Sequence, residues 1–467
     1  MKKIGKLKIH PSREIEKSFV SIGFECLDRD MFKGERCIEP LLETGAKHAR
    51  VQTGWAKCEK EPGVYDFAWL DATVEPLIAG GINVWFNVGF GNPLYMHDAP
   101  PHNDTCVGCV PILYGDEVVR AWENYVEALC RHYAGKVTMF EIWNEANHPP
   151  FWYPGTPDPI EYAAFYRLTA KVIKRIIPDA VCGGCITWTA YGTYTGILNG
   201  EYYHRFMDEL KPDEIDFLSY HYYGRIPEAK RNIMLKLLRE NLDERGFSNV
   251  KLIQGEAGYP SWAYVGHSCI KEGTDSERAQ AVWQLRRYFN DAKMGIDMSS
   301  FFQIADMWER PYRTATQNIP KCAGHGILRG LTYEKKESYR TFSIIANLMR
   351  DDFAVTDGDF TVEADGVKEA AERCEFTKGM SADAISGDAI ERLTLTRHGF
   401  KLYSFHALLK VSEPAEFDVK ITLPEPLTDP VLLDCYTGEI FEEPDLDHMT
   451  LREYPQILCE RSALEIE

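Results

Sequence analysis

The sequence predicts a (β/α)8 barrel followed by a smaller antiparallel β-sandwich. Over roughly the first 300 residues, eight short apolar runs alternate with helical patterns, which is typical of a parallel α/β barrel. Beyond about residue 350, short alternating strands with Pro-rich turns replace this pattern. The chain has 467 residues, more than a barrel of about 250 residues needs, so a second domain fits.

The barrel strands are expected at the apolar runs, whose nearly continuous apolar character suits strands covered on both faces. We predict them at residues 19–24, 49–53, 83–88, 138–143, 181–185, 217–220, 251–254 and 299–303. The helices between them carry boundary signals. Asp158 and Pro159 begin one helix. Thr274 and Glu277 form a capping box for another, which ends at Gly295.

The C-terminal region is predicted to be an antiparallel β-sandwich, with strands at residues 393–396, 401–405, 415–422 and 431–434. A strand at about residues 6–10 would complete it. We therefore divide the chain into an N-terminal strand segment, a catalytic barrel and a sandwich domain, at residues 1–15, 16–348 and 349–467. No repeat or low-complexity linker separates the last two, so we expect them to pack firmly.

The charge of the chain excludes two classes of partner. Lys plus Arg is 52 and Asp plus Glu is 71, which gives a formal net charge of −19. Such a surface repels nucleic acid and anionic membranes. No apolar run approaches the roughly 20 residues of a membrane helix, and the N-terminus lacks the apolar core of a secretory signal. The 13 cysteines are an odd, scattered set typical of reduced thiols, so we expect a cytoplasmic protein.

Two glutamates stand where apolar runs end, and they predict a catalytic pair. Glu145 follows Trp143 and Asn144, and Glu256 follows the run that ends at Gln254. Burying a carboxylate at such a position is costly unless it is used. In a barrel both glutamates would lie at the carboxyl ends of strands, where catalytic groups gather. Glycoside hydrolysis needs two carboxyl groups on opposite faces of a sugar, which fits this pair. The alternative is that each glutamate forms a structural ion pair.

These residues resemble the clan A (β/α)8 glycoside hydrolases, and most of all glycoside hydrolase family 39. The likeness spans roughly residues 18 to 345. It rests on Trp143-Asn144-Glu145 with Glu256, and on segments 50–57, 63–71 and 89–95. The chain departs from the Arg-x-His motif expected on the second strand, because Gln52 follows Arg50 in place of the histidine. The preferred sugar therefore stays open.

The resemblance implies roles for several residues. Glu145 would be the general acid/base and Glu256 the nucleophile of a retaining reaction. Asn144 would bond the sugar 2-hydroxyl, and Arg50, His221 and Tyr223 would surround the nucleophile. For His221, a core histidine bonded to the backbone is the alternative. The further substrate-binding candidates are Trp308 and Asn92, with Trp55, Tyr95 and Trp152 as weaker aromatic platforms for which simple packing is at least as good an explanation.

A loop after the third strand carries a pattern that could bind zinc. Cys106 and Cys109 have the spacing of zinc ligands, and His97 and His102 precede them. The alternative is a loop with free thiols, since a similar spacing recurs at Cys182 and Cys185 within a predicted strand. Such a zinc would be structural. The glycosidase chemistry needs no metal and no cofactor.

The sequence as a whole predicts a retaining glycosidase that cleaves small β-linked glycosides, with β-xylosides as the leading expectation. The alternatives are a β-glucosidase, β-galactosidase or arabinosidase of the same clan, or a carbohydrate-binding barrel without turnover. The expected partner is a small oligosaccharide or glycoside, and a homo-oligomer stays open.

Overall fold

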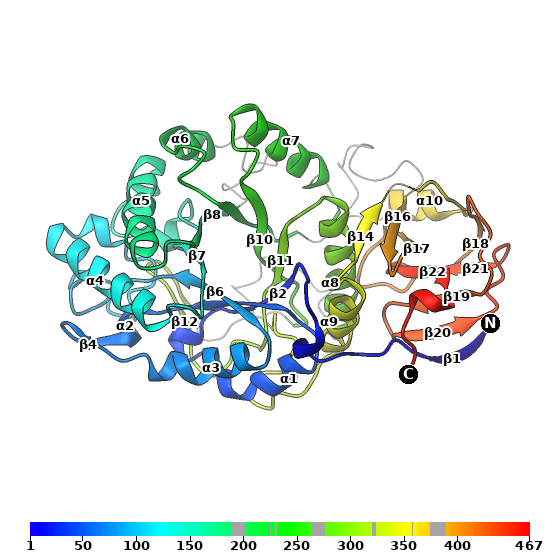
Figure 1. Ribbon diagram of the computed structural model, residues 1–467, viewed down its shortest axis with the longest axis horizontal. Helices are drawn as coiled ribbons and strands as arrows, with labels where there is room; N and C mark the ends of the chain where they lie inside the picture. The colour runs from blue at the N-terminus through cyan, green and yellow to red at the C-terminus, as the bar shows by residue number, and fades with distance from the viewer. Residues whose placement is uncertain are drawn as a thin grey trace.

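Eight parallel strands close into a barrel in sequence order, as the alternation of apolar runs predicts (Figure 1). The computed structural model describes residues 1–187, 201–224, 226–228, 231–262, 276–319, 324–356, 358–373 and 389–467. Around the barrel the strands are β2 Val20–Phe24, β3 His48–Gln52, β6 Asn83–Val88, β7 Met139–Ile142, β8 Val181–Thr187, β9 Phe217–His221, β10 Lys251–Ala257 and β11 Met298–Phe301. Each lies within three residues of its predicted bounds, because its apolar side chains are buried on both faces.

Helices surround the barrel and follow its strands (Figure 1). They are α1 Ile38–Leu42, α2 Trp55–Cys58, α3 Ala68–Ala79, α4 Asp116–His132, α5 Pro159–Ile176, α6 Glu201–Glu209, α7 Arg231–Glu244, α8 Glu277–Lys293 and α9 Glu337–Leu348. Asp158 caps α5 as predicted, because its side chain accepts hydrogen bonds from the backbone N–H groups of Ile160 and Glu161. Helix α8 is capped by Ser276, and the predicted cap Thr274 lies outside the described residues.

The C-terminal region forms two antiparallel sheets with an apolar layer between them. The larger sheet contains β1 Lys2–Lys6, β20 Glu439–Glu442, β19 Pro430–Asp434, β22 Gln456–Glu460, β17 Phe400–Ala407, β16 Ile390–Arg397 and β14 Ala354–Thr356. The smaller sheet contains β15 Thr361–Glu363, β18 Phe417–Thr422 and β21 Met449–Leu451. Helix α10 Val367–Arg373 and four short strands complete the described elements: β4 Glu59–Glu61, β5 Val64–Tyr65, β12 Tyr312–Arg313 and β13 Asn318–Ile319.

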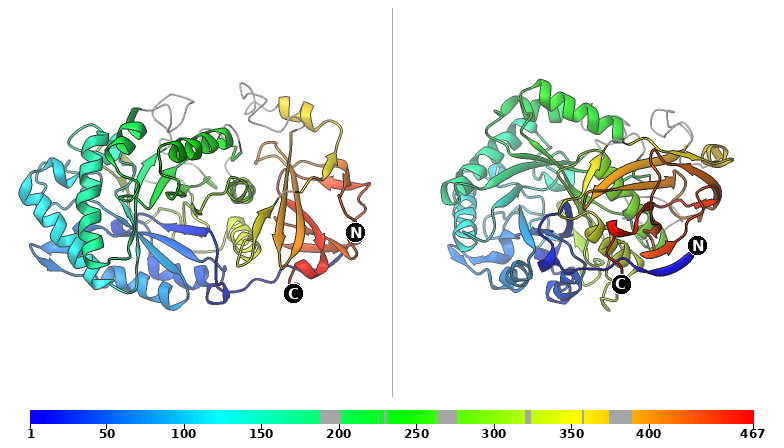
Figure 2. Two further views of the ribbon diagram at one scale, coloured as in Figure 1. Left: turned by 45° about the horizontal axis from the view of Figure 1, so that its top comes forward. Right: turned by 45° about the vertical axis from the view of Figure 1, so that its right-hand side comes forward.

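The N-terminal strand belongs to the larger sheet, although it starts earlier than the sequence suggested. β1 pairs antiparallel with β20, with Lys2 opposite Glu442 and Lys6 opposite Glu439. The chain then crosses to the barrel, so both termini lie at the sandwich end of the molecule (Figure 2). None of the helices in the described part of the chain is long and apolar enough to span a membrane.

A buried charge network joins the barrel to the sandwich. Glu228, on the connection after β9, forms an ion pair with Arg286 of α8 at 2.7 Å. His406 of β17 lies 3.2 Å from the same carboxylate, and Arg286 also donates to the backbone carbonyl of Leu409. The side chains of Glu228, Arg286 and His406 are almost fully buried. A buried charge that loses its partner is strongly destabilising. These contacts therefore favour one relative position of the two domains.

Candidate active site

Glu145 stands just past the end of β7 in a backbone conformation that few residues adopt. Trp143 and Glu145 have φ angles of 68° and 46°. Such left-handed positions in non-glycine residues cost free energy and concentrate at functional sites. Trp143 is held by burial and by a hydrogen bond from its indole nitrogen to the carbonyl of Phe151, which fixes the turn that presents Glu145.

Glu256 points into the barrel because β10 changes register immediately before it. Gln254, two residues earlier, bonds outward to Arg287 of α8, so a regular strand would direct Glu256 the same way. The register of β10 with β9 shifts between Gln254 and Glu256, which places Glu256 beside His221. Gly255 permits this close packing: a Cβ there would lie 2.1 Å from Oγ of Ser219 and 2.9 Å from Oε1 of Glu141.

The two glutamates lie close together with His221 between them. One carboxylate oxygen of Glu145 and one of Glu256 lie within 4.8 Å of each other and of a ring nitrogen of His221. Nδ1 of His221 lies 2.9 Å from Oε1 of Glu145 and 3.7 Å from Oε2 of Glu256. Each carboxylate is about one-eighth exposed, whereas the imidazole is buried. This arrangement can pass a proton between Glu145 and His221 while Glu256 stays available to a ligand.

Arg50 donates hydrogen bonds to several polar groups of the site. Its Nη1 atom donates to Oε2 of Glu256 at 3.1 Å and to Oε1 of Glu25 at 2.8 Å. Its Nε and Nη2 atoms donate to Glu141, and Nη2 also donates to Oδ1 of Asn144 at 2.8 Å. The guanidinium is fully buried and planar, so it fixes the positions of these groups with little freedom.

The ionisation of the site follows from burial and these neighbours. Burial opposes charge on Glu145, but the hydrogen bond and positive potential of His221 bring the pKa of Glu145 below its usual range. Burial likewise opposes charge on His221, yet Cys185, Glu256 and Glu145 raise its pKa well above the ordinary value. Glu145 and His221 therefore share one proton and titrate as a unit. Burial raises the pKa of Glu25 to about 7, so this carboxyl holds a proton in weak acid.

Tyr223 completes the surroundings of Glu256, since its hydroxyl donates to Oε1 at 2.5 Å. Together with Arg50 it gives each of the two carboxylate oxygens of Glu256 its own hydrogen-bond donor. The predicted neighbours Arg50, Asn144, His221 and Tyr223 thus all lie around the two glutamates. Trp308 is partly exposed and packs edge-to-face on Trp262, with ring centroids 5.0 Å apart.

Gln52 stands where the resemblance predicts histidine. Two hydrogen-bond donors hold its side chain in one orientation. Its Oε1 atom accepts hydrogen bonds from the backbone N–H of Cys26 at 2.9 Å and from Arg29 at 2.5 Å. Because two donors fix the carbonyl end of the amide, the orientation of Gln52 is set by the protein. Arg29 is itself buried and paired with Asp28.

Two predicted substrate-binding residues have structural roles instead. Trp55 is fully buried, stacks on Tyr95 and Tyr125, and donates its indole N–H to Glu59. Asn92 is also buried, and both amide hydrogens bond backbone carbonyls of Trp55 and Glu59. Neither residue has a surface left for a sugar. Among the weaker candidates, Trp152 is likewise fully buried, and Tyr95 bonds Glu59 through its hydroxyl.

The loop after β6 does not assemble the four ligands suggested by sequence. Cys106 and Cys109 are buried and share a hydrogen bond, which lowers the pKa of Cys109. His97 is exposed, and His102 bonds the backbone carbonyl of Thr314 at 3.0 Å. Among the described residues, the groups that could hold a metal ion are Glu141, Cys185 and His221, and Glu145, His221 and Glu256. Both groups belong to the site around the two glutamates, and neither includes a residue of this loop.

Three further residues lie at the site although the sequence did not predict them as site residues. Glu25 and Glu141 bond Arg50, and Cys185 contacts His221. Each interrupts or closes an apolar strand, which is a signal that could have drawn attention to it. Their mutual contacts depend on neighbouring strands, so the sequence alone does not reveal them.

Known proteins share both the sequence pattern and the architecture. Residues 56–254 match the profile of Glycosyl hydrolases family 39. A β-xylosidase of Geobacillus stearothermophilus is 22% identical over 338 residues, which cover 64% of this chain and 59% of that protein. The chain thus spans less than two thirds of the length of this relative.

Two solved structures extend the likeness to nearly the whole chain. A family 39 glycoside hydrolase from Bacteroides cellulosilyticus WH2 is 17% identical with a TM-score of 0.65, covering 95% of this chain and 81% of that one. A family 39 β-xylosidase from Caulobacter crescentus is 16% identical with a TM-score of 0.57, covering 98% and 97%. The fold of the chain is the one seen in these (β/α)8-barrel structures, and the sequence of residues 56–254 is similar to glycosyl hydrolases of family 39.

Proposed function

We propose that this chain is a retaining glycoside hydrolase that cleaves small β-linked glycosides, with β-xylosides as its first expected substrates. The observation that carries the proposal is the approach of Glu145 and Glu256, whose nearest oxygens lie within 4.8 Å. Retaining enzymes hold their two carboxyl groups about 5 to 5.5 Å apart, whereas inverting enzymes need about 6.5 to 9.5 Å to admit a water molecule. The shorter spacing supports direct attack by one carboxylate on the sugar.

In the first step Glu256 attacks the anomeric carbon and Glu145 protonates the departing oxygen. Arg50 and Tyr223 donate to Glu256 and hold its carboxylate in place, which supports its assignment as the nucleophile. His221 lies 2.9 Å from Glu145 and supports the acid role, because the pair holds a proton that Glu145 can deliver.

In the second step Glu145, now ionised, removes a proton from water, which attacks the glycosyl ester on Glu256. The imidazole of His221 stabilises the ionised Glu145 that the first step leaves behind. Asn144 is anchored by Arg50 through its Oδ1 atom, which leaves its amide N–H groups to donate toward a sugar hydroxyl.

The choice of β-xylosides rests on the names of relatives, the β-xylosidases of Geobacillus stearothermophilus and Caulobacter crescentus. Gln52 replaces the expected histidine, so β-glucosides, β-galactosides and arabinosides belong in the same assay.

A panel of aryl glycosides tests the proposal. We expect the purified protein to hydrolyse an aryl β-xyloside. Glu256→Ala should be inactive on every substrate, whereas Glu145→Ala should lose most of its activity only on substrates with poor leaving groups. Glu35→Ala, which truncates an exposed glutamate away from the site, is the control and should keep the activity. No hydrolysis of any aryl glycoside, combined with measurable binding of free sugars, would instead identify a carbohydrate-binding barrel.

A further inference from the structure

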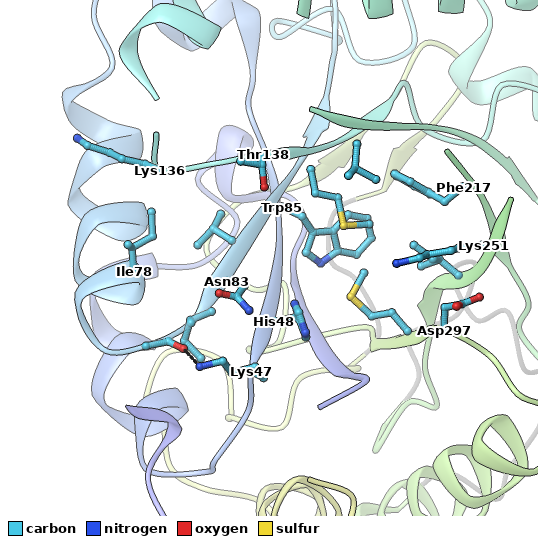
Figure 3. Close-up of a pocket in the computed structure, with 17 residues that line it drawn as sticks. Lys47, His48, Ile78, Asn83, Trp85, Lys136, Thr138, Phe217, Lys251 and Asp297 are labelled. Carbon is cyan, nitrogen blue, oxygen red and sulfur yellow. Dashed lines mark hydrogen bonds between the residues drawn. The ribbon is translucent and has the colours of Figure 1, made fainter. Parts of the chain in front are cut away.

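Accessible aromatic rings are the surfaces on which a sugar can stack, and the two ends of the barrel differ in them. At the amino ends of the strands, a cavity is lined in part by Trp85 and Phe217, but both side chains are buried (Figure 3). At the carboxyl ends, Trp262 and Trp308 each keep part of their surface exposed. Because the C–H face of a sugar packs on an exposed aromatic ring, these two tryptophans are candidates for sugar contact.

Trp262 and Trp308 form an aromatic corner. Trp262 lies on the connection after β10 and Trp308 on the connection after β11, and these two strands are neighbours in the barrel. The ring centroids are 5.0 Å apart and the ring planes meet at 78°. The backbone of Trp308 is held as well, since its N–H donates to the carbonyl of Met31 at 3.1 Å. A pyranose placed in this corner would have apolar walls on two sides.

The corner is linked to the surroundings of Glu256. The backbone N–H of Gly324 donates to the carbonyl of Trp262 at 2.9 Å, and a Cβ on Gly324 would lie only 2.1 Å from Nε1 of the indole. The next residue, His325, packs edge-to-face on Tyr223 with ring centroids 6.2 Å apart. Tyr223 in turn donates to Glu256. A short chain of contacts thus joins Trp262 to the donor of the proposed nucleophile.

The corner also lies on the side of the barrel that suits the sugar under attack. Glu256 is on β10, next to β11, whereas β7, which precedes Glu145, stands on the opposite side of the closed barrel from β11. A sugar in the corner would therefore lie toward the β11 side of Glu256, with Glu145 across from it. This arrangement suits the glycone, because its leaving group must face the acid.

Asp306 holds Trp262 through the indole nitrogen. The indole N–H donates to Oδ2 of Asp306 at 3.4 Å, and the backbone N–H of Gly330 donates to the same oxygen at 3.2 Å. The other oxygen, Oδ1, accepts from the backbone N–H of Gly326 at 2.9 Å and from Nζ of Lys336 at 2.6 Å. Each carboxylate oxygen therefore serves two donors, which fixes the plane of the carboxylate.

Lys336 holds the same segment at a second point. Its Nζ atom also donates to Oγ of Ser261, the residue before Trp262, at 2.8 Å. Lys336 and Asp306 are both almost fully buried. Burying an ion pair costs desolvation free energy that a well-packed apolar pair would avoid. The pair is therefore better explained by the position it gives to Trp262 than by a gain in stability.

We propose that Asp306, together with Lys336, is a positioning residue that fixes Trp262 across from Trp308, and that the resulting corner binds the sugar attacked by Glu256. The inference rests on the proposed glycosidase function and adds the groups that orient its sugar. Asp306 is buried, so it acts through the indole of Trp262 and not by contact with the sugar.

Binding of free sugars tests the proposal without turnover. Titration calorimetry of the full-length protein with xylose, glucose, galactose and arabinose identifies the sugar that binds most tightly, which is then the probe. Trp262→Phe keeps an aromatic ring but has no N–H to donate, and it should weaken binding by roughly three- to tenfold. Asp306→Asn should weaken binding by a similar factor, because the amide nitrogen of asparagine would face two donors.

A double-mutant cycle separates positioning from a general loss of stability. If Asp306 acts through Trp262, Asp306→Asn should cause little further loss of affinity in the Trp262→Phe background. The matched control Glu453→Gln alters another buried carboxylate, which pairs with Arg278 of α8, and it should lower the melting temperature but leave the affinity unchanged. Trp262→Phe leaves the pair of Asp306 and Lys336 intact, so it tests the corner even if Asp306→Asn does not fold.

Kinetics on aryl glycosides of the same sugar locate the corner. Trp262→Phe should lower kcat/KM by the same factor for good and poor leaving groups, because the corner holds the sugar and not the leaving group. Additive losses in the double variant, unchanged affinity in Trp262→Phe, a factor that varies with the leaving group, or no binding of any of the four sugars would overturn the proposal. Sugar binding without hydrolysis would contradict only the proposed function.

Discussion

The Sγ atom of Cys185 lies 3.3 Å from Nε2 of His221, on the side of the imidazole opposite Glu145. The backbone N–H of Glu145 donates to the same sulfur, also at 3.3 Å. Burial raises the pKa of the Cys185 thiol, so the sulfur is uncharged and accepts hydrogen bonds from both groups. One buried thiol thus positions the histidine and the turn that carries Glu145.

Cys185→Ala should move the pH profile of the proposed enzyme. Without the sulfur, the Nε2–H group of a protonated His221 has lost its acceptor, so the proton shared with Glu145 is held less tightly. The alkaline limb of kcat/KM should shift to lower pH by about 1 unit, since hydrogen bonds to charged groups are worth about 1.5 to 3 kcal/mol. Measurement of kcat/KM against pH checks this.

The serine variant and a neighbouring cysteine provide the controls. Cys185→Ser retains an acceptor and should restore most of the profile. Cys182→Ala removes another buried thiol of β8, whose pKa is also raised by burial but which does not bond His221, and it should leave the profile unchanged. A profile that is identical in Cys185→Ala and the unchanged protein would contradict the positioning role.

The two glutamates should give different phenotypes when truncated. Glu145→Ala should lose about 100-fold to 10,000-fold on substrates with poor leaving groups, yet keep much of the first step on activated aryl glycosides, which need little protonation. Azide should rescue this variant, because an anion needs no general base. Glu256→Ala should be inactive on both substrate types. Steady-state kinetics on paired substrates checks this, and exchanged phenotypes would reverse the role assignment.

The spacing of Glu145 and Glu256 also predicts the stereochemistry of hydrolysis. Since no room for a water molecule separates a bound sugar from a carboxylate this close, the first sugar released from a β-glycoside should be the β-anomer. Proton NMR during the first minutes of hydrolysis distinguishes the anomers before they equilibrate. The α-anomer as first product would exclude the double-displacement mechanism.

Glu25 should make the stability of the fold depend on pH. Burial raises its pKa from an ordinary 4.5 to about 7, so the folded protein binds this proton more tightly than the unfolded chain does. Its contribution to stability is fully present below about pH 4.5 and is lost as the pH rises through about 7, with a total of roughly 3 kcal/mol.

Replacement of Glu25 by glutamine isolates this effect. Glu25→Gln mimics the protonated side chain at every pH, so its melting temperature relative to the unchanged protein should rise between about pH 5 and pH 8. Glu35→Gln, which alters an exposed glutamate, should show no such trend. A melting-temperature difference for Glu25→Gln that stays constant or falls with pH would contradict the assigned proton.

The sequence predicted the barrel strands well because each is an apolar run whose burial on both faces leaves little choice of structure. The sequence was less informative where a residue type was interpreted without its partners. Trp55 and Asn92 follow strands, as binding residues do. However, the indole N–H of Trp55 donates to the side chain of Glu59, and the amide of Asn92 donates to backbone carbonyls. For the alternative of a zinc site, Cys106 and Cys109 have the spacing of ligands, but His97 is exposed and His102 bonds the backbone carbonyl of Thr314.

Other residues of the site were missed: Glu25, Glu141 and Cys185 were not predicted as site residues. Each is defined by a contact across strands: Arg50 of β3 brings the two carboxylates together, and Cys185 of β8 meets His221 of β9. Such contacts depend on strand order and register. The sequence does not predict the register change before Glu256 either, although a glycine, Gly255, lies at that position.

The buried network of Glu228, Arg286 and His406 has a consequence for how this protein could have evolved. The strand that ends in His221 continues into the connection that carries Glu228, so the sandwich restrains a segment close to the proposed catalytic residues. A barrel without its sandwich would leave Glu228 and Arg286 facing solvent or a mismatched surface. Exchange of the C-terminal domain by recombination therefore requires a replacement that supplies the imidazole and the Leu409 carbonyl at the same positions, and the two domains are expected to be inherited together.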